Sequence, residues 1–149
     1  MAIRRFGYAH ERQRAEDRII DLMISAEALF LCDYGKDNYI GEIRYRLSLR
    51  AALFLASEPE SRKTVFRWMR DAYDLRSKLA HGGEISSVKL PKHPDGTSVD
   101  LEEFVSAIQT YLRSALVKAI QLVNDPSTPK HLVEWDALVF GTYLKGLTT

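Results

Sequence analysis

The sequence contains a single cysteine, Cys32, among 149 residues. A disulfide within the chain is therefore impossible, and no zinc site can be built from several cysteines. We expect Cys32 to be a small apolar residue near a helix end, in a protein of the reducing cytoplasm. The net charge is only +1, which excludes a polycation that attracts nucleic acid through its overall field. Any RNA-binding surface must then be a local patch.

Long apolar runs are also missing. Residues 1–18 are basic, but no apolar core follows them, so we expect no signal peptide. The most apolar stretch, residues 19–32, carries Asp21 and Glu27 and is too short and too charged to span a bilayer. We therefore expect a soluble protein with no membrane partner.

Motifs for cofactors and metal ions are absent as well. The sequence has no P-loop, no dinucleotide-binding glycine pattern and no nucleophile elbow. His10, His93 and His131 are scattered and lack the spacing of metal ligands. We predict neither a cofactor nor a metal ion.

Apolar residues instead recur at the spacing of amphipathic helices. The pattern predicts helices over residues 11–33, 39–57 and 60–80, a fourth that Asp100 opens and Asp125-Pro126 ends, and a short fifth over residues 130–144. Glu103 follows Asp100 by three residues, a variant of the capping box. A long loop over residues 82–99 precedes the fourth helix. Because 46% of the residues are hydrophobic, enough for a core, we expect one all-α domain over residues 1–149, a bundle of four to five helices.

Two charged residues interrupt the apolar stripes of the predicted helices. The stripe of the third helix runs through positions 65, 69, 72, 76 and 79, and position 76 is an arginine. The stripe of the first runs through 20, 23, 27 and 30, and position 27 is a glutamate. Burying a lone charge costs several kcal/mol, so we expect Arg76 and Glu27 to pair or to share a cleft. A purely structural salt bridge between two helices is the alternative.

His81 lies five residues after Arg76, at the end of the same helix. At about 100° per residue, the two side chains point about 140° apart. Both can face one groove only if the helix end unwinds, which Gly82 and Gly83 permit, or if a second copy of the chain completes the site. The alternative is a histidine that interacts favourably with the helix dipole.

The segment YDLRSKLAHGG, residues 73–83, resembles the R-x4-H motif of HEPN domains (higher eukaryote and prokaryote nucleotide-binding), specifically the ApeA-like branch. IIDLMISAEALF, residues 19–30, and RYRLSLRAALFLA, residues 44–56, resemble the first two helices of that branch. The resemblance implies an up-down helical bundle, commonly dimeric. It also implies a metal-independent endoribonuclease of toxin, CRISPR-associated or anti-phage systems, or a catalytically silent module for dimerisation and for binding RNA, nucleotide or protein.

On this resemblance, Arg76 clamps the scissile phosphate and His81 acts as acid or base, because imidazole titrates near neutrality. Ser77 stands where many HEPN proteins have Asn, Asp or His, and it matches the ApeA-like pattern. One histidine cannot easily make both proton transfers, so we expect a homodimer that supplies two histidines. An antitoxin or another protein is a second candidate partner. The supporting residues would be Glu27, Tyr73, Ser77 and Lys78, and the RNA track would be Arg44, Arg46, Arg50 and Arg70.

Two of these assignments have structural alternatives. The basic residues form either a phosphate track or an ordinary solvated helix face. Trp68 and Tyr73 either stack on bases or pack in the core or at a dimer interface.

Overall fold

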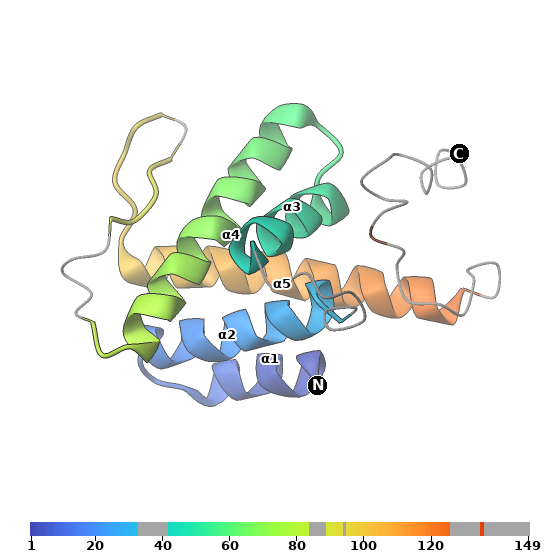
Figure 1. Cartoon of the computed structure of the whole chain (residues 1–149), viewed down its shortest axis with the longest axis horizontal. Coiled ribbons are helices and arrows are strands. Elements are labelled where there is room, and N and C mark those ends of the chain that lie inside the picture. The colour runs from blue at the N-terminus through green and yellow to red at the C-terminus, as the bar shows by residue number, and fades with distance from the viewer. Residues whose placement is uncertain (33–41, 84–88, 94, 126–134, 136–149) are drawn as a thin grey trace.

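The computed structural model describes residues 1–32, 42–83, 89–93, 95–125 and 135. These residues form five helices (Figure 1): α1 (Ala2–Glu11), α2 (Ala15–Phe30), α3 (Ile43–Leu55), α4 (Pro59–Ala80) and α5 (Leu101–Asn124). Within the same ranges, β-pairing is limited to one isolated bridge between Lys92 and Ser98. The prediction of an all-α fold is therefore confirmed.

Helix α2 lies at the centre and contacts each of the other four helices. Its buried residues include Leu22, Met23 and Phe30, which face side chains such as Leu47 of α3 and Ile108 of α5 in one core. No helix in the described ranges combines the length and apolar composition that a membrane span requires.

Trp68 belongs to this core. The residue is 5% exposed, and its ring centroid lies 5.4 Å from that of Phe104 and 6.4 Å from that of Tyr111 on α5. Core packing, one of the two alternatives for Trp68, is confirmed.

α4 and α5 begin and end close to their predicted positions, whereas α3, predicted over residues 39–57, spans only Ile43–Leu55 of the described residues. α4 has a proline at its first position, where the missing N–H costs nothing. The carboxylate of Asp100 accepts a 2.8 Å hydrogen bond from the backbone N–H of Glu103, which confirms Asp100 as the cap of α5. The predicted fifth helix, residues 130–144, lies outside the described residues except for Trp135, whose ring is buried against Phe30 and Phe54.

The helix predicted over residues 11–33 corresponds to α2, but its predicted start is wrong. Arg12 and Arg14 adopt extended backbone conformations, so α2 begins only at Ala15 and a separate helix, α1, precedes it. The two helices pack against each other, and two arginines join them to one buried carboxylate: Nη1 of Arg5 and Nε of Arg12 each lie 2.9 Å from an oxygen of Asp21. Helix α1 was not predicted.

Candidate functional site

Arg76 of α4 pairs with Glu27 of α2, as the two interrupted stripes predicted. Nη2 of Arg76 lies 3.4 Å from both carboxylate oxygens of Glu27, and each side chain is 27% exposed. The residues that precede them, Leu75 on α4 and Ala26 on α2, are both fully buried. The charged pair therefore lies at the edge of the apolar seam, one position away from where the stripes put it, and remains accessible to a ligand.

The surroundings of this pair perturb the titration of Glu27. Partial burial raises the pKa of the Glu27 carboxyl, and the positive charge of Arg76 opposes that shift only in part. The ring of Tyr73 also lies near Arg76, with its centroid 5.9 Å from the guanidinium carbon. Arg76 thus has both a carboxyl group and an aromatic ring as neighbours.

The raised pKa of Glu27 predicts a pH effect on stability. A carboxyl whose folded-state pKa exceeds its ordinary value of 4.5 makes the protein bind more protons when folded than when unfolded. The free energy of unfolding should therefore fall as the pH rises from about 4.5 through the raised pKa of Glu27. Glu27→Gln should remove this pH-dependent part of the stability. Urea unfolding of both proteins at several pH values between about 4 and 8 measures it. Parallel stability curves for the two proteins would contradict the prediction.

Helix α4 keeps its regular geometry up to the residue before His81. His81 is the C-cap, and Gly82 follows with φ +74°, in the left-handed region that favours glycine. The N–H of Gly82 donates to the carbonyl of Leu79 (3.1 Å), and that of Gly83 donates to the carbonyl of Lys78 (2.9 Å). This is a Schellman cap. The two glycines therefore close the helix and do not unwind it.

The same cap explains the rest of the motif. A Cβ atom on Gly83 would lie 2.6 Å from Cγ of Lys78, so any larger residue would force the lysine side chain to move. The carbonyl of Ser77 accepts a 3.3 Å hydrogen bond from the backbone N–H of His81. The residue His81 is exposed. With the helix intact, Arg76 and His81 leave the axis about 140° apart. Among the interactions of the described residues, none joins these two side chains.

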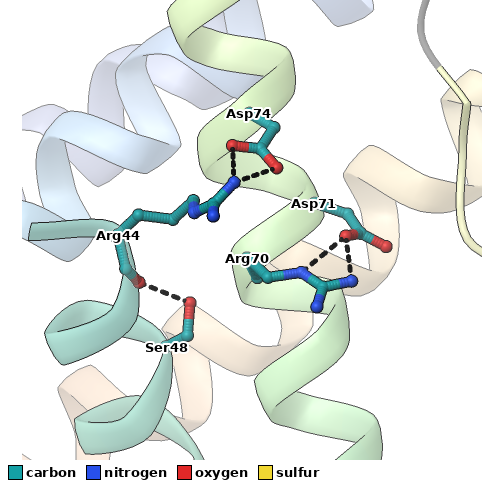
Figure 2. Close-up of polar contacts among 5 residues, drawn as sticks. All are labelled: Arg44, Ser48, Arg70, Asp71 and Asp74. Carbon is teal, nitrogen blue, oxygen red and sulfur yellow. Dashed lines mark hydrogen bonds and ion pairs between the residues drawn. The ribbon is translucent and has the colours of Figure 1, made fainter. Parts of the chain in front are cut away.

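The predicted RNA track is not assembled as a row of free cations. Figure 2 shows Arg44 reaching from α3 to Asp74 of α4, with Nη1 2.9 Å and 3.0 Å from the carboxylate oxygens. Arg70 in the same view bonds to Asp71, its neighbour on α4, at 3.1 Å and 3.2 Å. Partial burial raises the pKa of Asp71, and Arg70 opposes the shift. Two of the four predicted arginines therefore already have a carboxylate partner.

The prediction that Arg50 lies on the solvent-facing side of its helix is wrong. The residue is 4% exposed, its Nη1 donates a 2.7 Å hydrogen bond to the carbonyl of Phe30, and its guanidinium lies 5.2 Å from the ring centroid of Trp135. Arg50 follows Leu47 by three residues and precedes Phe54 by four, the spacing that marks a buried face. Arg46 is half-buried.

Cys32 is exposed just after α2, so its expected place near a helix end is confirmed. No cluster of three potential metal ligands occurs among His, Cys, Asp and Glu in the part of the chain that the structure describes. No protein-family model, curated protein or solved structure matches this chain. The resemblance to HEPN domains therefore rests on the motif residues themselves.

Proposed function

We propose that the chain is a metal-independent endoribonuclease of HEPN type, acting in the cytoplasm in a defence or stress response. One observation carries the proposal: Arg76 is paired with a half-buried carboxyl group of raised pKa, and an exposed histidine ends the same helix. A lone structural salt bridge does not require a histidine at the end of the same helix. The spacing between Arg76 and His81 is that of the R-x4-H motif.

The chemistry follows from the substrate. RNA supplies its own nucleophile, the 2′-hydroxyl, so cleavage requires a proton acceptor, a proton donor and stabilisation of charge on the phosphate. Arg76 would grip the phosphate oxygens through two N–H groups. His81 would take or give the proton. The step as written requires no metal ion.

Helix geometry favours a homodimer as the active form. Since Arg76 and His81 of one chain point about 140° apart, an arginine of one copy and a histidine of the other can meet at a two-fold axis near the end of α4. Such an arrangement also brings two histidines to one cleft, one for each proton transfer. Light scattering at micromolar concentration should then show a dimer.

RNA cleavage in EDTA tests the proposal directly. Purified wild type should cleave total RNA and leave 2′,3′-cyclic phosphate and 5′-hydroxyl ends, while DNA, which lacks the 2′-hydroxyl, resists. His81→Ala should lose about 10²–10⁴ in rate, the range that positioned acid–base groups contribute. Because His81 is exposed at a helix end, circular dichroism of the variant should remain helical. Equal rates for the two proteins would contradict the proposal.

A second candidate function is a catalytically silent HEPN module that dimerises and binds RNA, nucleotide or a protein such as an antitoxin. The ion pairs of Arg44 and Arg70 favour its protein-binding form, because these two arginines of the predicted RNA track already have carboxylate partners. Absence of cleavage by the wild type, together with RNA binding that His81→Ala retains, would favour this module over the nuclease.

A further inference from the structure

A groove of about 360 Å³ lies between α3 and α4, away from the Arg76–Glu27 pair. Its lining residues are either apolar or cationic. We call the apolar ones, Leu49, Ala52, Leu53 and Phe66, the floor, and the cationic ones, Arg62, Lys63, Arg67 and Arg70, the rim. None of the residues that line the groove is acidic, although the chain as a whole carries a net charge of only +1.

The rim is partly fixed in place. Nε of Arg62 donates a 2.9 Å hydrogen bond to the carbonyl of Ala56, so its guanidinium is oriented by the end of α3. Lys63 and Arg70 contact Glu60 and Asp71. Arg67 is exposed and makes no hydrogen bond or ion pair with the described part of the chain. It is therefore the rim cation best placed to meet an added anionic group.

We propose that this groove binds an acidic amphipathic helix of a partner protein. Leucine-like side chains of that helix would fill the floor, and flanking carboxylates would meet the rim, the usual mode of helix-in-groove recognition. The sign of the rim requires an acidic partner. This inference does not depend on the nuclease activity.

The floor distinguishes a protein helix from a nucleic acid. Single-stranded RNA is held chiefly by bases stacked on aromatic faces, whereas three of the four floor residues are aliphatic. The one aromatic ring, that of Phe66, is already packed against Tyr45, with ring centroids 5.6 Å apart at 71°. Apolar side chains are the better match for such a surface.

The length of the rim determines which sequence pattern a partner helix needs. Residues 62–70 of one helix extend over about 12 Å, since each residue rises 1.5 Å. Two turns of a partner helix cover that distance. A matching sequence has leucines at i, i+4 and i+7 with glutamates beside them, because these positions share one face.

A synthetic peptide of about 16 residues with this leucine and glutamate pattern is the probe. Fluorescence anisotropy should show saturable binding to the full chain that weakens as salt increases. Arg67→Glu should weaken it about tenfold or more, equivalent to about 1.4 kcal/mol. Arg113→Glu, the same charge reversal at an exposed position of α5 outside the groove, should leave binding unchanged.

Three outcomes overturn the proposal: no saturable binding of the acidic peptide, equal binding of a peptide with lysines in place of the glutamates, or equal loss with Arg67→Glu and Arg113→Glu. Arg67-dependent binding of an oligouridine without binding of the peptide also overturns it and identifies a nucleic-acid site. Backbone amide shifts in α3 and α4 on peptide addition to the wild type provide a readout that needs no variant. His81→Ala should bind the peptide as the wild type does, so failure here is separate from failure of the nuclease proposal.

Discussion

Replacing Arg5 and Arg12 together by alanine is expected to lower the free energy of unfolding by about 3–5 kcal/mol, the cost of leaving a buried charge without its partners. The carboxylate of Asp21 is 3% exposed, and each of its oxygens accepts one 2.9 Å hydrogen bond from one of these arginines. The same hydrogen bond and charge raise the pKa of Arg12. Urea unfolding followed by circular dichroism measures the loss.

The effect should be concentrated in α1, because the two arginines belong to that helix and its C-cap. Amide hydrogen exchange over residues 2–11 should therefore accelerate more than exchange in α4 or α5. Arg4→Ala, an exposed arginine on the same helix, is the matched control and should change stability by no more than about 0.5 kcal/mol.

A third substitution separates a stranded charge from a general loss of packing. Adding Asp21→Asn to the double variant removes the buried charge at nearly constant volume, so part of the lost stability should return. A triple variant no more stable than the double variant would show that the carboxylate charge is not the cause.

The later part of the fold could be predicted closely from the sequence. α4 and α5 are long, strongly periodic helices that begin at Pro59 and after Asp100, residues with a physical reason to stand there. Gly82 marks the end of α4 because a left-handed cap needs it.

The break between α1 and α2 has no such local signal. Residues 12–14 are Arg, Gln and Arg, all good helix formers, and the extended conformation there serves a distant interaction, that of Arg12 with Asp21. The position of the break is explained by Asp21 on α2, which Arg12 contacts. The pattern of residues around the break does not reveal this contact.

The candidate site was predicted in outline but misplaced by one position. Pairing of Arg76 with Glu27 followed from two charges in apolar stripes. Periodicity alone could not decide that Leu75 and Ala26 are fully buried while the charged pair lies beside them. Arg50 follows the same rule: its spacing from Leu47 and Phe54 is that of a buried face, and the side chain is buried although it carries a charge.

The shifted position of the pair matters for function, because a partly exposed arginine can exchange one anionic partner for another. If Arg76 clamps phosphate as proposed, Arg76→Lys should lower the rate of RNA cleavage by about 10²–10³, the loss seen when one donor to a developing charge is removed. Lysine keeps the positive charge opposite Glu27 but presents a point charge in place of a planar fork with two parallel donors. Cleavage kinetics at saturating RNA measure the rate.

Stability and activity should then respond differently to the same substitution. Since the Arg76–Glu27 pair is partly solvated, a lysine at position 76 should change the free energy of unfolding by less than about 1 kcal/mol. If Arg76 only joins α2 to α4, the lysine preserves that role and the cleavage rate stays at the wild-type value, which contradicts the clamp. If Arg76 binds phosphate, the Arg76→Lys protein should be stable and dimeric but inactive. Loss of a salt bridge or of the helix cap would not explain a loss of activity in a protein that remains folded.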